Sequence, residues 1–141
     1  MGLIRESDNS LPLVIVRKRD KSIRLCVNYA NINAKIVNDH PAPLPDAIFG
    51  RAAGAKYIRT IEIRCAYYQI ELAEESNKYT AFRFENALFE WNRLPMGLKI
   101  SSIVFQRLVD RVLRSAHSFA SSVIDDIMCH SNRFEEHVSH L

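Results

Sequence analysis

The sequence predicts an α+β fold in which helices pack on one face of an antiparallel sheet. Three features of the 141-residue chain carry this prediction: paired alternating segments joined by short polar turns, a long amphipathic helix set between strand-like runs, and a second amphipathic segment that follows them. Strands and helices mixed in this order are typical of α+β domains. The length and the hydrophobic content of 48% fit one globular domain with a buried core.

The N-terminal half is predicted to form a hairpin, a short helix and a strand. After ten polar residues in an extended conformation, residues 13–16 and 23–27 form the hairpin, with a basic tip at 17–22. Residues 31–40 show no clear period. Pro45 suits the first helical position and Gly54 a C-terminal stop, which predicts a helix over 45–52. Residues 56–64 alternate as a strand that carries Glu62 between two isoleucines.

The C-terminal half is predicted to contain another hairpin and the longest helix. Residues 79–84 and 88–93 form its strands and 85–87 its turn, where Asn86 suits a left-handed position. Residues 94–97 form a loop, and Ser101 or Ser102 can cap the helix that follows. A last amphipathic helix begins within 132–141. The long helix has an apolar stripe opposite a polar face of Gln106, Arg107, Asp110, Arg111 and Arg114, and the stripe consists of Val104, Phe105, Leu108, Val109, Val112, Leu113 and Ala116.

Composition excludes several classes of protein. The net charge of +3 and the pI near 8.9 give only a mild attraction to polyanions. Cys26, Cys65 and Cys129 are odd in number and lie among apolar residues, which predicts reduced, buried thiols rather than a disulfide framework. No apolar run approaches the roughly 18 residues of a membrane span, and the N-terminus lacks the apolar core of a signal peptide. We therefore expect an intracellular protein, cytoplasmic or nuclear, with no membrane partner.

Two adjacent carboxylates, Asp125 and Asp126, lie inside the apolar run 122–128. A solvated Asp-Asp turn is one explanation, because turns favour Asp. The other explanation adds Glu62, a third acid in an apolar strand. If the strands that carry these acids are neighbours, three carboxylates converge, and such a cluster suits two Mg²⁺ ions, which prefer oxygen ligands.

The chain resembles the fingers and palm of a reverse transcriptase (RNA-directed DNA polymerase) from the Pol polyprotein of gypsy-type LTR retrotransposons. Six motifs in the family's order carry the resemblance across almost all 141 residues. They are Val16-Arg17-Lys18-Arg19-Asp20 with Arg24 and Cys26-Val27-Asn28-Tyr29; Gly54-Ala55-Lys56-Tyr57 through Tyr67-Tyr68-Gln69-Ile70; Thr80-Ala81-Phe82; Leu94-Pro95-Met96-Gly97-Leu98 with Phe105-Gln106; Ile124-Asp125-Asp126-Ile127; and Glu135-Glu136-His137.

The resemblance implies a catalytic and metal-binding set of Glu62, Asp125 and Asp126, with two Mg²⁺ ions. The implied reaction is attack of a primer 3′-hydroxyl on the α-phosphorus of a deoxynucleotide, directed by an RNA or DNA template. It also implies a nucleotide-binding set, in which Lys18 and Arg24 meet the triphosphate, Tyr67 lies under the sugar, and Met96 and Gly97 line the nucleotide and template pocket.

Several departures from the family pattern qualify this activity. Glu62 stands where the family has Asp, and Val123 where it has an aromatic residue; Asn28 and Ala30 replace Asp and Arg, Lys21 replaces a turn glycine, and Ser102 replaces proline. The resemblance covers residues 1–141 as a fingers and palm fragment without the thumb, connection and ribonuclease H domains, which other Pol domains of a longer product would supply. We therefore expect a truncated or degenerate retrotransposon copy that is inactive as this fragment alone.

Two other functions stay open beside the polymerase. One is a non-catalytic, nucleic-acid-binding remnant of a retroelement that uses Lys18, Arg19 and Arg24. The other is a metal-binding module formed by Cys129, His130, His137 and His140, which the spacing disfavours because it fits no common zinc pattern.

Overall fold

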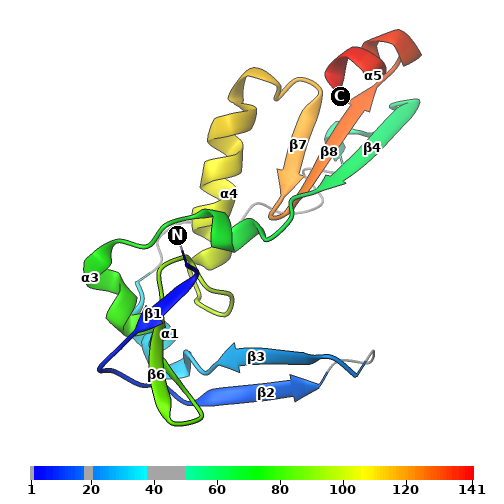
Figure 1. The fold of residues 1–141 in the computed structure, drawn as a ribbon. Helices are drawn as coiled ribbons and strands as arrows, with labels where there is room; N and C mark the ends of the chain where they lie inside the picture. The colour runs from blue at the N-terminus through cyan, green and yellow to red at the C-terminus, as the bar shows by residue number, and fades with distance from the viewer. Residues whose placement is uncertain (1, 18–20, 38–49) are drawn as a thin grey trace. The chain divides into compact units, whose positions relative to one another are not determined.

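The computed structural model describes residues 2–17, 21–37 and 50–141, and it divides the chain into two compact units (Figure 1). Unit 1 contains Met1–Asn38 and Tyr67–Ser101, and unit 2 contains Asp39–Ala66 and Ser102–Leu141. The chain therefore leaves unit 1, enters unit 2, returns to unit 1 and ends in unit 2. Each unit has its own antiparallel sheet, and we describe each by itself.

Unit 1 is built on a three-stranded sheet and a separate hairpin. The sheet has the order β1-β6-β5, with β1 at Ile4–Glu6, β5 at Phe82–Phe84 and β6 at Ala87–Trp91. The hairpin pairs β2 (Leu13–Arg17) with β3 (Ile23–Val27), as predicted. Strand β1 was not predicted. It is held on β6 because the buried Glu90 carboxylate accepts hydrogen bonds from Arg5 Nε at 2.7 Å and Ser7 Oγ at 2.7 Å.

The helices of unit 1 differ from the sequence prediction in two places. The segment without a clear period forms α1 (Ala30–Lys35), which begins where the Asn28 side chain accepts the Ala30 N–H at 3.0 Å. The predicted strand over 79–84 begins only at Phe82, because Lys78–Thr80 form the short helix η2; η1 at Ala66–Gln69 and α3 at Glu74–Asn77 precede it. Buried Thr80 ends this turn, because its hydroxyl donates to the Asn77 carbonyl and accepts the Trp91 N–H.

Unit 2 contains a second three-stranded sheet with the order β4-β8-β7. The strands are β4 (Tyr57–Glu62), β7 (Ala120–Val123) and β8 (Asp126–Ser131). The helices are α4 (Ser101–Val112), which η3 (Leu113–Ser115) extends, and α5 (Phe134–His140). Ser101, the first residue of α4, belongs to unit 1.

Both helices of unit 2 pack on the same face of its sheet. Gln106 of α4 bonds Ser122, and His137 of α5 lies 3.1 Å from Ser131 Oγ. The strand register puts Ser122 and Ser131 on one face, because side chains alternate along a strand and paired residues share a face. The predicted α+β fold, an antiparallel sheet with helices on one face, is thus confirmed in unit 2.

Three predicted details of unit 2 are wrong or lie outside the described residues. In α4, Phe105 and Val109 are buried as expected, but Val112 is 69% exposed and polar Gln106 is buried. Cys65 is exposed rather than buried, while Cys129 is buried and all three cysteines are free. Most of the predicted helix over 45–52 lies outside the described residues. Within the described part of the chain, no helix is long and apolar enough to cross a membrane.

Candidate active site

The three predicted acids of unit 2 lie at one end of its sheet. In the register of β4 and β8, Glu62 lies directly opposite Asp126, so their side chains share a face, and their Cβ atoms are about 4.5–5.5 Å apart in such a pair. Asp125 occupies the turn between β7 and β8, and its carbonyl accepts the Ile63 N–H at 2.8 Å. The expectation that the strands carrying these acids are neighbours is therefore confirmed by the pairing of β4 with β8.

Glu62 and Asp126 lie on the sheet face opposite the helices, and Asp125 lies in the adjoining turn. Glu62 and Asp126 are exposed and Asp125 is half-buried. Val123 pairs with Asp126 from the other side, so a row of Val123, Asp126 and Glu62 crosses all three strands. Within the described residues, no three His, Cys, Asp or Glu side chains lie close enough together to hold a metal ion. The acids thus share a sheet end without forming a complete protein cage.

A buried glutamine holds the turn that carries the Asp pair. Gln106 is 4% exposed, its Oε1 accepts the Ile124 N–H at 2.7 Å, and its Nε2 donates to Ser122 Oγ at 2.8 Å. The same Nε2 lies 2.8 Å from Asp110 Oδ1. Ile124 has φ of 57°, a left-handed conformation that is costly for a β-branched residue and persists only where neighbours impose it. Gln106 therefore fixes the position of the acidic turn from behind the sheet.

Sequence reasoning missed this role of Gln106. It placed Gln106 on the polar face of α4, whereas the structure buries it against β7. The available signal was the Phe105-Gln106 pair, which belongs to the motifs that resemble the reverse transcriptase family. A glutamine suits this position because its amide can both accept from a backbone N–H and donate to a serine.

The alternative metal module is not formed. His137 Nδ1 and His140 Nδ1 lie 3.1 Å and 2.9 Å from Ser131 Oγ, and one hydroxyl can donate to one of these nitrogens and accept from the other. The His140 ring also stacks on Phe119, with 3.7 Å between the ring centroids. His130 and Cys129 are consecutive on β8 and point to opposite faces. The described residues thus give these histidines a structural role.

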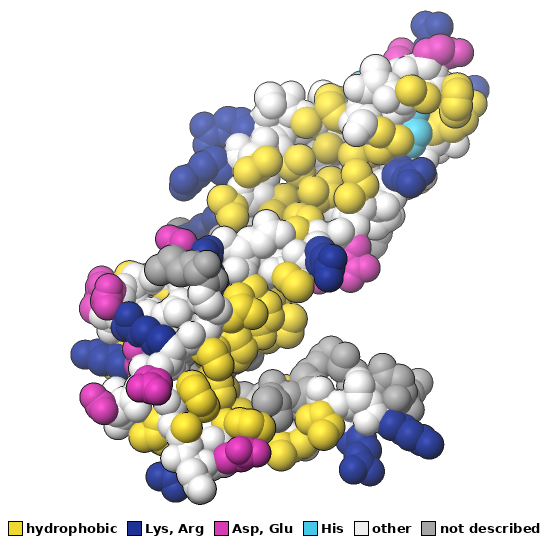
Figure 2. Space-filling view, viewed as in Figure 1, with side chains coloured by type: hydrophobic (Ala, Val, Ile, Leu, Met, Phe, Trp, Pro, Cys, Tyr) yellow, Lys and Arg dark blue, Asp and Glu magenta, His cyan; other side chains and the backbone are white. Residues whose placement is uncertain are grey.

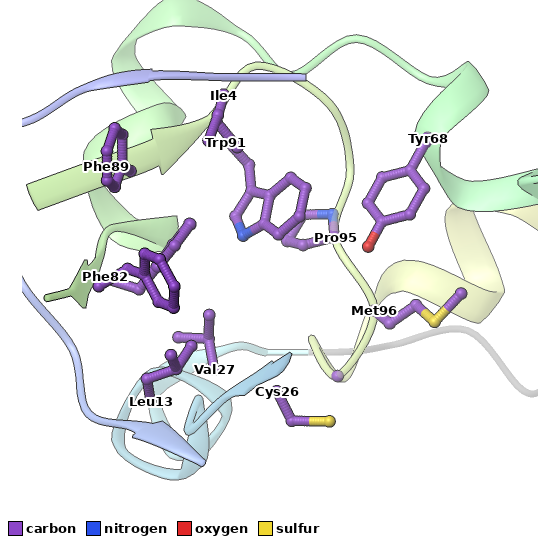
Figure 3. A pocket seen from close by; sticks show the side chains of 12 residues that line it. Ile4, Leu13, Cys26, Val27, Tyr68, Phe82, Phe89, Trp91, Pro95 and Met96 are labelled. Atoms are coloured by element: carbon purple, nitrogen blue, oxygen red, sulfur yellow. The ribbon is translucent and has the colours of Figure 1, made fainter. Parts of the chain in front are cut away.

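The predicted nucleotide-binding residues belong to unit 1, where two of them line a pocket. Met96 and Gly97 border a cavity of about 680 Å³ with aromatic walls, together with Cys26 and Val27 of β3 (Figure 3). Among the described residues, Tyr68 rather than its neighbour Tyr67 lines this cavity. Lys18 lies outside the described residues. Arg24 lies on β3, the strand that the alternation predicted, and it pairs with Val16 of β2.

Stacked aromatic rings form the wall of this pocket. Figure 3 shows Trp91 between Phe82 and Tyr68. The Trp91 and Tyr68 rings are stacked with centroids 5.1 Å apart, and the Phe82 ring lies 5.6 Å from Trp91. Aromatic pairs at these separations add a little to the free energy gained by burying their area. The pocket therefore has a stiff apolar wall, to which the 94–97 loop brings Met96.

Helix α1 holds the 94–97 loop in place. The Asn33 side chain donates to the Gly97 carbonyl at 2.9 Å and accepts the Lys99 N–H at 2.8 Å. Gly97 has φ of 95°, a conformation that favours glycine, and a Cβ there would lie in van der Waals contact with Tyr29 Cδ2 at 3.4 Å. Burial raises the pKa of the Tyr29 phenol, and the charge of Tyr68 raises it further.

Comparison with known proteins identifies the family. Residues 16–141 match the family described as "Reverse transcriptase (RNA-dependent DNA polymerase)". The chain is 33% identical over 147 residues to the retrovirus-related Pol polyprotein from transposon 297 of Drosophila melanogaster, covering 98% of this chain and 14% of that protein. It is 33% identical over 149 residues to the enzymatic polyprotein of Cestrum yellow leaf curling virus, covering 99% of this chain and 23% of that protein.

A solved structure agrees with the fold. The prototype foamy virus protease-reverse transcriptase superposes with a TM-score of 0.90 at 23% identity, over 99% of this chain and 19% of that one. A foamy viral protease-reverse transcriptase, which also matches, has been solved in complex with an RNA/DNA hybrid. The chain thus spans less than a quarter of the length of these relatives. From the family match and this fold, the chain belongs to the reverse transcriptase family and is related to the reverse transcriptase domains of retroelement polyproteins.

Proposed function

We propose that unit 2 carries the metal-dependent nucleotidyl-transfer centre of a reverse transcriptase, with Glu62, Asp125 and Asp126 as its catalytic acids. The observation that carries the proposal is the strand register, which sets Glu62 opposite Asp126 while Ile63 bonds the Asp125 carbonyl. Three acids from two distant segments thus lie at one end of the sheet, and Glu62 and Asp126 are exposed there. This arrangement is what a site for substrate phosphates and cations requires.

The donor chemistry of these acids fits Mg²⁺. Carboxylate oxygens are hard ligands, and Mg²⁺ is usually held by one or two protein carboxylates plus waters and substrate phosphates, so a complete protein cage is not needed. Two such ions, when bound, would activate the attacking 3′-hydroxyl and stabilise the leaving pyrophosphate. Glu62, Asp125 and Asp126 would supply the negative charge, and Gln106 would keep the turn in position.

Unit 1 supplies the proposed nucleotide and template contacts. We assign the deoxynucleotide triphosphate to Lys18 and Arg24, its sugar to Tyr67, and its base and the template to the pocket side of Met96 and Gly97. Two contacts support the assignment to Met96 and Gly97. Asn33 of α1 bonds the Gly97 carbonyl, and the ring of Trp91 stacks on that of Tyr68 in the pocket wall. The proposed partners are a primed RNA or DNA template and the other Pol domains of a longer product.

Ion binding by the chain itself tests the acidic centre. Mn²⁺ can replace Mg²⁺ at carboxylate sites and broadens nearby NMR signals, so the amide signals of Glu62, Ile63 and Asp126 should broaden first as Mn²⁺ is added. Asp125→Asn should weaken this effect, whereas Glu135→Gln, an exposed acid in α5, should leave it unchanged. Equal broadening at the α5 acids and at the sheet end would contradict the assignment.

Activity tests the catalytic role. In a longer protein that adds a related thumb and connection, Glu62→Asp should raise Mg²⁺-dependent incorporation on a primed RNA template. The extra methylene of Glu62 displaces a ligand by about 1 Å, and a misplacement of this size can cost about 10²-fold in rate. Asp125→Asn should abolish incorporation, and Val123→Tyr should change it less because it alters packing rather than a ligand. If both acid variants left the rate unchanged, the three acids would not form a catalytic cluster.

A second candidate function is nucleic-acid binding without turnover. It rests on the basic tip of the β2–β3 hairpin, where Arg17 and Lys21 are exposed. So few cations predict weak binding whose affinity falls with salt along a shallow slope, because few counterions are released. Fluorescence anisotropy with a labelled RNA/DNA hybrid at several salt concentrations measures that slope. A salt-independent affinity would exclude this electrostatic mode.

A further inference from the structure

Unit 2 has a second polar cavity, which the proposed active site does not use. It holds about 280 Å³, lies between the C-terminal half of α4, η3 and β7, and is lined by Arg51, Gln106, Asp110, Leu113, Arg114, His117, Ala120, Ser121 and Ser122. Figure 1 shows α4 and β7 side by side, and Figure 2 shows Lys and Arg side chains gathered beside α4. The lining therefore combines cationic side chains with hydroxyl groups.

The charges in this cavity are unbalanced. Arg51 and Arg114 are exposed cations that form no ion pair within the described residues, and His117 stands beside them. The one acid in the lining, Asp110, already accepts a hydrogen bond from Gln106. Arg51 and Arg114 together carry two positive charges, and Asp110 carries one negative charge. An anion entering the cavity would thus meet a net positive wall.

The hydrogen-bonding groups in the lining point to the same ligand chemistry. Ser121 lines the cavity through its backbone, because its side chain alternates with that of Ser122, which faces α4. Guanidinium groups present several N–H donors in a fixed fork that matches tetrahedral oxyanions, which favours phosphate over a singly charged anion.

We infer that this cavity binds a phosphate group, contacted by Arg51 and Arg114. Small-molecule pockets usually hold about 300–1,000 Å³, so a cavity of about 280 Å³ admits a phosphate group but not a whole nucleotide. The phosphate is that of free inorganic phosphate or of a nucleic-acid strand whose remaining atoms stay outside. The inference stands apart from the proposed acidic centre, because neither Glu62, Asp125 nor Asp126 lines the cavity.

Titration of the ¹⁵N-labelled full chain with inorganic phosphate at constant ionic strength tests the inference. The amide signals of Ala120, Ser121 and Ser122 should shift and saturate. Arg114→Gln and Arg51→Gln should each raise the dissociation constant roughly tenfold or more, as expected for a charge-assisted hydrogen bond. Arg107→Gln is the matched control, because it removes the same charge from an exposed position on α4 outside the lining, and it should change the constant less than about twofold.

Two results would overturn the inference: no saturable shift at Ser121, or an equal loss of affinity in Arg107→Gln and Arg114→Gln. The latter would indicate diffuse attraction to the helix. Because Arg51 and Arg114 lie on separate segments, misfolding of one variant leaves the other as a test. Asp125→Asn should leave phosphate binding unchanged, which separates this cavity from the acidic centre.

Competition distinguishes the two sources of phosphate. Dinucleotides with and without a 5′-phosphate are added to the phosphate-saturated chain. Displacement by the phosphorylated form alone assigns a terminal phosphate, and displacement by both forms assigns the phosphodiester. If neither dinucleotide displaces inorganic phosphate, the nucleic-acid source is excluded and free phosphate is the ligand.

Discussion

Replacing Gln106 by alanine should loosen the turn that carries Asp125 and Asp126. The amide of Gln106 is the only described side chain that bonds the Ile124 N–H, and it also bonds Ser122 through both its hydroxyl and its carbonyl. Gln106→Ala removes these bonds together and leaves a half-buried backbone donor without its partner.

The size of the effect follows from the number of bonds lost. Each hydrogen bond contributes about 1 kcal/mol net, and an unsatisfied buried donor costs about 1–3 kcal/mol. We therefore expect Gln106→Ala to lower the free energy of unfolding, or of local opening at the turn, by about 2–4 kcal/mol. That loss corresponds to a roughly 30- to 900-fold rise in the opening equilibrium.

Amide hydrogen exchange at Ile63 and Ile124 measures this opening directly. Ile63 is informative because its N–H is bonded to the Asp125 carbonyl, on the far side of the turn from Gln106. Arg107→Ala is the control, since its side chain is exposed on the same helix, and it should change protection by less than about 0.5 kcal/mol. If Gln106→Ala and Arg107→Ala show equal protection at both amides, Gln106 does not hold the turn.

Four further predictions concern stability, pH and chemistry. Gly97→Ala should destabilise the chain by about 1–3 kcal/mol, because φ is 95° there, whereas Gly50→Ala, with nothing within 4 Å of its added Cβ, should have little effect in the same urea titration. Burial raises the pKa of Tyr29 in the folded chain, so the unmodified chain should lose stability as pH rises above about 10, the pKa of an unfolded tyrosine. Tyr29→Phe should lose less stability between pH 9 and 11, and an equal loss in both chains would contradict this direction. Iodoacetamide should modify exposed Cys65 before buried Cys129, whose pKa burial raises, as peptide mass spectrometry can show. Exposed apolar residues on β4 and α5 should make the chain associate at micromolar concentration in light scattering, and a stable monomer would argue against this.

Local patterns were sufficient to predict the strands of the acidic centre. The alternation over 56–64 and the apolar run 122–128 correctly indicated β4, β7 and β8, although every residue of β4 is exposed. The adjacency of Glu62 and Asp126 could be stated only as a condition, since pairing across 64 residues leaves no local trace. The family resemblance supplied the reason to expect it.

Errors occurred where side-chain hydrogen bonds override local preference. Helix α1 begins at the Asn28 side chain and is held by Asn33, contacts that no apolar period reveals. In the β5–β6 turn, Glu85 rather than Asn86 takes the left-handed conformation, with φ of 53°. Asparagine is the usual residue at such positions, but the register of Phe84 with Ala87 leaves Glu85 as the first turn residue.

The placement of Gln106 and the acids separates two causes of lost function that mutagenesis often confuses. Glu62 and Asp126 are exposed, so changing them removes little packing, whereas Gln106 and Ser122 are buried behind them and determine where the turn lies. Asp125→Asn should therefore weaken ion binding while the exchange of the Ile63 and Ile124 amides stays as in the parent. Gln106→Ala should weaken ion binding only together with faster exchange, because it displaces acids whose charge is intact. If Asp125→Asn also accelerated exchange, the Asp125 carboxylate would hold the turn itself, and its loss could no longer be interpreted as the loss of a ligand.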